Sequence, residues 1–545
     1  MKTLWNNKLL VLALLSITLF VVNLDALFVN IMEARNFITA REMLQDGNWI
    51  FTTLNGEPRY QKPPLPTWIT AAFGFVFSLK NIIFLRLPAA LMGILLVLVT
   101  YKFSLKIFRN KQLGFIGGLI LATSFYVVSA SRDSNWDIYT HAFMMLGIYS
   151  VFRLLTKESK KYGYALLAGL CIGASFLSKG PVSLYALFLP FLIAYGVTYK
   201  FKKLKVKRTP ILLFLLLAIL VSGSWYWYVY TFDAATISKI TQKEAANWTG
   251  YNVRPFYYYW SFFTQSGVWT IVTFISLLYP YLKNRVSDKK AYTFTLLWTL
   301  GSLVLLSIIP EKKSRYLLPV LIPLALNAAF YIEYLINKFS ELKDKRETIP
   351  VYFNFGLIAI IGLVFPIGGY FFLKDQLSNN WFWFILLAVG LSVTGFLMFR
   401  FLLKKNIKKV FYLTIVFITV ILCFGMPLAK TLTVNPEFKN MKSILKLTNG
   451  KDLKAYDFAG FTPELIWNYG KPIPVLNTEE GITIPTEKSF VLLVTTDDTK
   501  RVINTFYNLG YSLEKVDYID MNPHPKESSS HKVRLYRNVF LVKRQ

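Results

Sequence analysis

Acidic, basic and tyrosine side chains recur in short hydrophilic turns that separate long apolar runs of the sequence. The residues in question are Glu33, Arg35, Gln61 and Lys62 in the first turn, Arg132, Asp133 and Asp137 in "SRDSNWD", Lys179 in "SKGP", and Lys313, Arg315 and Tyr316 in "PEKKSRYLLP". Cations of this kind neutralise a phosphate, and Arg binds two of its oxygens at once. A carboxylate can take the proton from an attacking hydroxyl. The combination favours group transfer from a phosphate-linked donor.

Each of these residues also has a simpler interpretation when it is taken alone. A single Lys or Arg at the end of a membrane span commonly anchors the span in the interface, and a Tyr there belongs to the aromatic belt. Asp133 or Asp137 could cap the helix that begins near residue 136. The occurrence of all of them together favours a site.

The composition excludes a soluble globular protein, because the 545 residues are 54% hydrophobic and have a mean hydropathy of +0.42. The net charge of +31 comes from basic clusters scattered between apolar runs, so no nucleic-acid partner is expected. Cys171 and Cys423 both lie in apolar runs, which excludes a disulfide framework. The apolar stretch of the first run, near residues 8–27, follows two lysines, Lys2 and Lys8, and lacks a cleavage pattern, so we expect a retained anchor.

Fourteen apolar runs are long enough to consider as spans, and the charge pattern decides which of them cross. Six basic loops separate them, near residues 102–111, 153–161, 200–208, 283–290, 338–346 and 400–409. If the second run (64–78, opening with "PPLP") lies in the interface, all six loops face the cytoplasm, as the positive-inside rule requires. Thirteen spans are therefore predicted.

This count makes residues 28–86 and everything after about residue 430 extracytoplasmic. Residues 31–44 have an amphipathic pattern that predicts a helix at the membrane surface. After residue 430, the runs "KAYDF", "SFVLLVTT" and "RLYRNVFLVKR" surround a helix-like "DTKRVINTFYNLGY". We therefore expect a transmembrane domain over 1–429 and a small extracytoplasmic α/β domain over 430–545.

The motifs occur in a recognisable order: "EARNFITAREML", "NGEPRYQKPPLPTW", "RLPAAL", "SRDSNWD", "SKGP" and "SRYLLP". In this order they resemble the bacterial branch of the protein O-mannosyltransferase superfamily (glycosyltransferase family 39-like), and most of all the lipid A 4-amino-4-deoxy-L-arabinose transferases. The resemblance runs over about residues 1–335 and is weaker beyond.

The resemblance implies a C-type glycosyltransferase fold with thirteen spans and with interfacial helices in the first external loop. It also implies that the enzyme takes a sugar from undecaprenyl phosphate and inverts the anomeric carbon. Glu33 or Asp137 would be the catalytic base, because Met32 stands where the family has its first acid. Donor-phosphate ligands would be Arg35, Lys62, Lys179, Arg315 and Tyr316, with Arg132, Asp133, Gln61 and Lys313 as further candidates.

The family's possible metal ligand before Lys-Pro-Pro is a Glu, and this chain has Gln61 there. None of the three histidines, His141, His524 and His531, is placed in the sequence to join Gln61. A zinc site of that kind is therefore not expected, and dependence on another divalent metal stays open.

The expected location is the bacterial cytoplasmic (inner) membrane, with a multi-pass chain whose active site and C-terminal domain are periplasmic. The partners would be the polyprenyl-phosphate donor, the bilayer, and an acceptor that the residues leave open between lipid A, another glycan and protein. A lipid or glycan transporter or flippase is the main alternative, although no internal repeat is found and the charges collect at one membrane face. A scaffold whose C-terminal domain binds envelope partners is a third.

Overall fold

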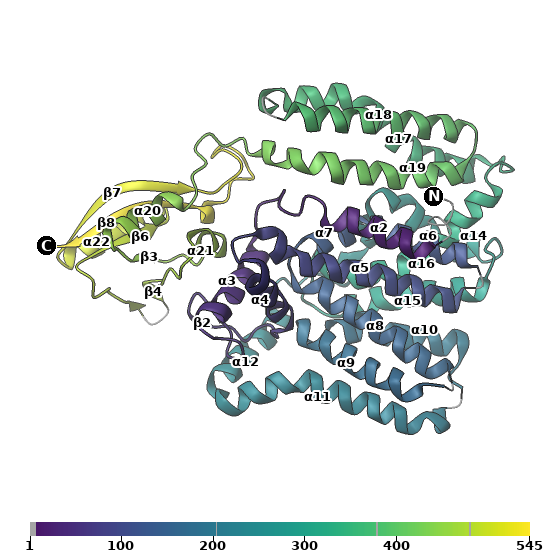
Figure 1. Cartoon of the computed structure of the whole chain (residues 1–545), viewed down its shortest axis with the longest axis horizontal. Coiled ribbons are helices and arrows are strands. Elements are labelled where there is room, and N and C mark those ends of the chain that lie inside the picture. The colour runs from purple at the N-terminus through teal and green to yellow at the C-terminus, as the bar shows by residue number, and fades with distance from the viewer. Residues whose placement is uncertain (1–6, 109, 158, 203, 378–379, 479–480) are drawn as a thin grey trace. The chain divides into compact units, whose positions relative to one another are not determined.

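The computed structural model describes residues 7–108, 110–157, 159–202, 204–377, 380–478 and 481–545, which form two compact units. The first unit contains the residues up to Ala26, Tyr60–Ile69 and Asn81–Leu428. The second unit contains Leu27–Arg59, Thr70–Lys80 and Ala429–Gln545. Figure 1 labels the elements of both.

The first unit is helical. Its helices are α2 (Lys8–Val21), α5 (Ile82–Ile107), α6 (Lys111–Thr123), α7 (Phe125–Arg132), α8 (Trp136–Thr156), α9 (Lys161–Lys179), α10 (Leu189–Tyr199), α11 (Arg208–Phe232), α12 (Ala234–Gly250), α13 (Thr270–Ser276), α14 (Tyr279–Leu282), α15 (Lys289–Ile308), α16 (Leu318–Lys338), α17 (Lys345–Leu373), α18 (Trp381–Leu403) and α19 (Ile407–Val420). The π-helix η1 (Leu184–Phe188) leads into α10, and the 3-10 turn η5 (Ser314–Leu317) leads into α16. Helix α4 (Leu65–Phe77), at the predicted interfacial run, begins in the first unit and ends in the second.

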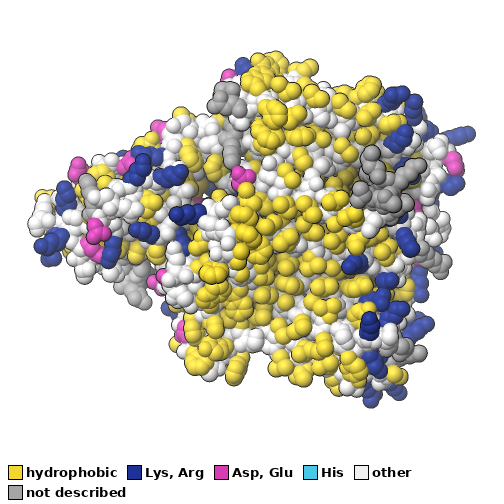
Figure 2. All heavy atoms as spheres, viewed as in Figure 1, with side chains coloured by type: hydrophobic (Ala, Val, Ile, Leu, Met, Phe, Trp, Pro, Cys, Tyr) yellow, Lys and Arg dark blue, Asp and Glu magenta, His cyan; other side chains and the backbone are white. Residues whose placement is uncertain are grey.

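Eight helices of the described residues are long and apolar enough to cross a membrane, or nine if the bent pair α6–α7 counts as one span. Helix α9 and the shorter apolar helices α2 and η1–α10 lie at three more of the predicted spans. Hydrophobic side chains cover the middle of this unit, whereas Lys and Arg gather at the right-hand edge of Figure 2. The chain is thus a multi-pass membrane protein.

Two predicted spans are not single straight helices. The run at 112–131 bends by 60° between α6 and α7. The run at 258–282 is a series of short 3-10 and α-helical pieces, in which Gly267 has a φ of 68°. That left-handed conformation suits glycine and breaks the helix, so this run is not one continuous helix.

The six basic loops meet at one end of the first unit. Glu333 near the end of α16 accepts hydrogen bonds from Asn110 and Ser287, which precede α6 and α15. Further contacts join the remaining loops: Lys207 donates to the Leu154 carbonyl and Lys405 to the Leu342 carbonyl, and the Lys290 ammonium lies 4.7 Å from the centroid of the Tyr199 ring. The packing of the helices therefore places all six basic loops at the same end of the unit, as the charge pattern requires.

The second unit is built around a four-stranded sheet in the order β3-β6-β8-β7. Its strands are β3 (Ala455–Asp457), β6 (Ser489–Val494), β7 (Tyr511–Asp520) and β8 (Tyr536–Arg544), and only the β3–β6 pair is parallel. Helices α3 (Ile31–Gln45), α20 (Lys442–Lys451) and α21 (Pro463–Tyr469) share a core with Val491 and Leu493, while α22 (Thr499–Asn508) packs with Phe490 and Leu492. Alternate residues of β6 thus serve opposite faces of the sheet.

The helix predicted over residues 31–44 is present as α3, and ten of its 15 residues are buried. Phe37 packs against Trp467 of α21, with ring centroids 5.2 Å apart and the rings tilted by 54°. The Glu42 carboxylate accepts hydrogen bonds from Thr53 and from the backbone of Asn55 in the β1 (Thr53–Leu54) to β2 (Glu57–Pro58) hairpin. The hairpin that follows the helix therefore satisfies the Glu42 carboxylate.

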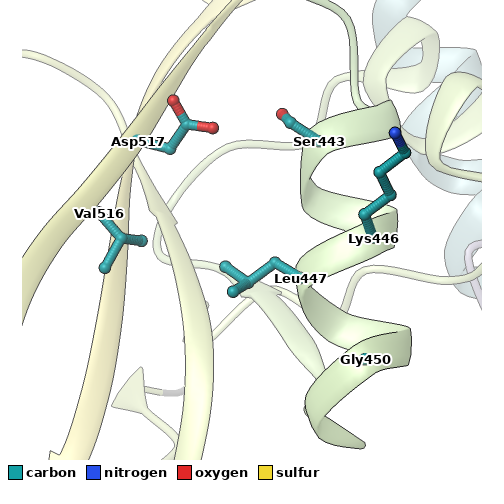
Figure 3. A pocket seen from close by; sticks show the side chains of 6 residues that line it. All are labelled: Ser443, Lys446, Leu447, Gly450, Val516 and Asp517. Atoms are coloured by element: carbon teal, nitrogen blue, oxygen red, sulfur yellow. The ribbon is translucent and has the colours of Figure 1, made fainter.

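A surface pocket of about 490 Å³ lies between α20 and β7. Ser443 and Leu447 of α20 point toward Val516 and Asp517 of β7, whereas Lys446 points away (Figure 3). The pocket contains none of the residues that the sequence analysis singled out.

Candidate active site

An ion pair between Asp137 and Lys179 is the centre of the candidate site. Asn135 caps α8, since its side chain accepts a hydrogen bond from the backbone N–H of Asp137 at 2.9 Å. Because Asn135 makes the cap, the Asp137 carboxylate is not used for it and accepts a bond from the Lys179 ammonium at the end of α9. Both side chains are at most one-tenth exposed, so each charge depends on the other.

Gly180 fixes where α9 ends and so where Lys179 lies. Its φ of 77° is in the left-handed region that favours glycine, and its backbone N–H bonds to Phe176 at 2.7 Å. The helix therefore stops directly after Lys179, and the chain turns toward η1.

The Tyr316 ring gathers the other cations of this end. The Lys179, Lys313 and Arg315 cationic groups lie 4.7, 5.7 and 5.8 Å from the ring centroid. The Tyr316 hydroxyl donates to Glu311 at 3.1 Å, and the Lys313 ammonium donates to the same carboxylate oxygen at 2.6 Å. Cation–ring contacts of this length are attractive, so the tyrosine offsets the mutual repulsion of the cations.

Lys62 faces the same group of charges from the loop before α4. Its ammonium is 3.7 Å from the Glu244 carboxylate of α12. Burial lowers the pKa of Lys62, and the carboxylates of Glu244 and Glu311 oppose that shift. The loop is anchored nearby by the Tyr60 hydroxyl, which donates to Asp233 at 2.9 Å.

Lys62, Asp137, Lys179, Lys313, Arg315 and Tyr316 thus lie in the first unit, together with Glu244 and Glu311. We call these eight residues the end cluster. Sequence reasoning did not select either glutamate. Glu311 stands in the same turn as Lys313 and could have been found, but nothing in the local sequence marks Glu244.

Glu33 and Arg35 lie on α3 in the second unit. Glu33 closes a capping box with Asn30, whose backbone N–H donates to the Glu33 carboxylate at 3.2 Å. Arg35 accepts a bond from Arg59 through its carbonyl oxygen. Burial, with the nearby charge of Arg35, lowers the pKa of Arg59 to about 9. The contacts described for the end cluster therefore all lie within the first unit.

The remaining candidates have other contacts. The Arg132 guanidinium donates to the carbonyl oxygens of Leu19 and Val22 at the end of α2, at 2.9 and 2.8 Å. Asp133 accepts a bond from the Asn135 side chain at 3.0 Å, and the Gln61 side chain is exposed. Among the described residues, no three His, Cys, Asp or Glu side chains are grouped so as to hold a metal ion.

The helical unit, which carries the end cluster at one end, has the C-type glycosyltransferase fold. The whole chain superposes on the crystal structure of ArnT from Cupriavidus metallidurans bound to undecaprenyl phosphate with a TM-score of 0.71, covering 99% of this chain and 98% of that one at 16% identity. The crystal structure of the same protein in the apo state gives a TM-score of 0.69. These matches show a shared fold.

Sequence comparison agrees with the resemblance found from the motifs. Residues 61–227 match the family described as dolichyl-phosphate-mannose-protein mannosyltransferase. An undecaprenyl phosphate-alpha-4-amino-4-deoxy-L-arabinose arabinosyl transferase of Proteus mirabilis is 24% identical over 67% of this chain, and one of Wigglesworthia glossinidia brevipalpis is 29% identical over 58%. The match spans 65% and 56% of those relatives' own lengths. The resemblance to this superfamily, with aminoarabinose transferases among the most similar relatives, is thereby confirmed.

Proposed function

We propose that this protein is a membrane glycosyltransferase that moves a sugar from undecaprenyl phosphate to an envelope acceptor, either a lipid A-like glycolipid, another glycan or a protein. The observation that carries the proposal is the end cluster: a carboxylate joined to a lysine and surrounded by cations on a tyrosine ring. The shared fold and the printed names of the relatives support the same donor class.

The donor phosphate would bind to the cations of the end cluster. Lys62 exchanges its Glu244 partner for a phosphate oxygen, and Arg315 can offer two parallel N–H groups. Lys179, which lies over the Tyr316 ring, and the Tyr316 hydroxyl complete the set. Fixed cations stabilise the charge that grows on the phosphate as it leaves.

The Asp137 carboxylate would orient the acceptor hydroxyl and take its proton. In that step the bond between the anomeric carbon and the phosphate oxygen breaks, and the bond from the acceptor oxygen to the anomeric carbon forms on the opposite face. Undecaprenyl phosphate leaves with the electron pair, and the sugar configuration is inverted. Glu33 is the other candidate base and Arg35 the other candidate phosphate ligand, both on α3.

The proposal includes a topology. We infer thirteen spans, a cytoplasmic N-terminus and cytoplasmic basic loops in the bacterial inner membrane, with the end cluster and the 430–545 domain in the periplasm. The gathering of the six basic loops at one end of the helices supports it.

The test is transfer by the purified protein in detergent from a labelled undecaprenyl-phosphate sugar to lipid A, with Lys62→Ala beside the wild type. We expect product from the wild type and a loss of about 100-fold or more in Lys62→Ala, at equal amounts of folded protein. A flippase would give no product in detergent, because it needs two compartments.

Lys80→Ala is the matched control, since Lys80 is an exposed lysine between α4 and α5 outside the end cluster. It should transfer as the wild type does. Full activity of Lys62→Ala would remove Lys62 from the mechanism, and inactivity of the wild type with every acceptor class would end the proposal.

A further inference from the structure

His141 lies one helical turn below Asp137 on α8, on the same face of the helix. Its side chain is buried, and its Nδ1 is 2.5 Å from the Ser183 hydroxyl oxygen, which is buried as well. Among the described residues its Nε2 has no hydrogen-bond partner. The bond to Ser183 is therefore the hydrogen bond that orients the ring among the described residues. The Nε2 atom is buried without a partner, which costs free energy.

Ser183 belongs to the short segment that joins α9 to η1. Lys179 ends α9, Gly180 turns the chain with its positive φ, and Ser183 precedes the π-helix. The segment is therefore attached to α8 twice, one turn apart: Lys179 bonds to Asp137, and Ser183 bonds to His141. Glycine allows many backbone conformations, so Gly180 alone would not fix the position of this segment. The bond between Ser183 and His141 restricts it.

We propose that His141 is a positioning residue for the Asp137–Lys179 pair, acting through its hydrogen bond to Ser183. By holding Ser183 against α8, it sets where the preceding turn places the Lys179 ammonium. The catalytic role of the Asp137–Lys179 pair rests on the proposed function. The claim that His141 sets the position of the Lys179 ammonium does not. Among the described residues, neither His141 nor Ser183 forms a hydrogen bond to a residue that would bind the donor phosphate.

Two substitutions of His141 separate its nitrogens. His141→Asn keeps a hydrogen-bonding group near the position of Nδ1, whereas His141→Gln keeps one near the position of Nε2. We expect His141→Gln and Ser183→Ala to lower kcat by about tenfold to 100-fold, with the KM for the donor within about twofold of the wild type. His141→Asn should retain most of the activity.

Ser175→Ala is the matched control. The Ser175 hydroxyl also joins α9 to α8, donating to the Thr140 carbonyl at 2.7 Å, and it is equally buried. Its bond lies before Lys179 and does not hold the segment after Gly180, so kcat should stay near that of the wild type. Equal losses of kcat in Ser175→Ala and Ser183→Ala would show that both serines act only through the packing of α8 and α9, and would overturn the proposal. An unchanged kcat in Ser183→Ala would overturn it as well.

A structure of His141→Gln tests the geometry without reference to transfer. We expect the Lys179 ammonium to leave hydrogen-bond distance of the Asp137 carboxylate. An unchanged pair overturns the proposal, whether or not the protein transfers sugar. Inactivity of the wild type, in contrast, would count against the proposed function alone.

Discussion

The charges of the end cluster fit a singly charged phosphodiester. Lys62, Lys179, Lys313 and Arg315 are four cations, and they face the three carboxylates of Asp137, Glu244 and Glu311. One positive charge is left over, which a polyprenyl-phosphate sugar would neutralise. When the sugar leaves, the phosphate gains a further negative charge, and the cations then hold the product state more tightly than the donor.

Tyr316 contributes to the end cluster in two ways that substitution can separate. Tyr316→Phe keeps the ring beneath Lys179 but loses the hydroxyl bond to Glu311, so kcat/KM should fall about tenfold. Tyr316→Ala also loses three cation–ring contacts, and kcat/KM should fall about 100-fold. The control Tyr258→Phe removes an exposed hydroxyl 3.4 Å from Ser314 and should change little. Equal losses in the Phe and Ala variants would show that the ring plays no part.

The lowered pKa of Lys62 predicts how donor binding depends on pH. Because the pKa lies below the ordinary 10.5, the ammonium loses its proton at a lower pH than a free lysine would. The donor KM should therefore begin to rise at a pH below the ordinary lysine value of 10.5 as the pH is increased. In Lys62→Arg the guanidinium stays charged, so the KM should stay flat over the same increase in pH.

Glu244→Gln provides the converse test. The Glu244 carboxylate holds the pKa of Lys62 up, so its removal should shift the rise in KM to a still lower pH. A KM that is independent of pH in the wild type would show that Lys62 carries no charge that the donor needs.

At the scale of elements, buried cations fix helix ends far from the chemistry. The Lys207 ammonium donates to the carbonyl oxygens of Leu154, Leu155 and Lys157 at 2.9, 2.7 and 3.1 Å, at the C-terminal end of α8. Those carbonyls have no partner within the helix, and a cation there also interacts favourably with the helix dipole. The other end of the same helix carries Asp137.

Lys207→Met should lower the free energy of unfolding by about 1–3 kcal/mol, because the carbonyls lose a charged donor. The loss would be measured as a lower Tm of the purified protein in detergent. Lys205→Met, at an exposed lysine two residues earlier, should leave Tm unchanged. Since α8 keeps its start, transfer per folded molecule should be preserved in both. An equal Tm in the two variants would contradict the assigned cap.

The helix ends and their charges could be predicted from the sequence, but the breaks within spans could not. Hydropathy is averaged over about 20 residues, and the run at 258–282 stays apolar across its break. The break depends on the left-handed φ of Gly267, which leaves no trace in an apolar average. The bend after Thr123 is hidden in the same way.

Helix α3 shows a second limit, because its buried polar residue Arg41 has a partner far along the chain. Its pattern predicted a helix at the membrane surface, but not that Arg41 donates to the Ile466 carbonyl or that Glu42 binds the β1–β2 hairpin. The Asn135 cap was a local signal and could have been recognised, since Asn before a helix start is a preferred cap. His141 gave no such signal, because its partner Ser183 is 42 residues away.

For the whole molecule, the decisive property is that one end of the helical unit is basic and the other carries the end cluster. One contact at the basic end joins residues more than 200 positions apart, Asn110 and Glu333. The orientation of this polarity in the membrane can be measured because the chain has two cysteines, Cys171 and Cys423. Replacing both with Ala gives a background for single cysteines.

Four exposed positions test the orientation: Gln61 and Ser314 at the end of the cluster, and Lys106 and Lys343 at the basic end. Lys106 is separated from Gln61 by α5, and Lys343 from Ser314 by α16. In intact cells, a membrane-impermeant maleimide should label cysteines at Gln61 and Ser314. Cysteines at Lys106 and Lys343 should react only after permeabilisation, because the positive-inside rule places their loops in the cytoplasm. If Gln61 and Ser314 were labelled from opposite sides, Lys62 and Tyr316 could not share one phosphate, and both the thirteen-span topology and the proposed transfer reaction would fail together.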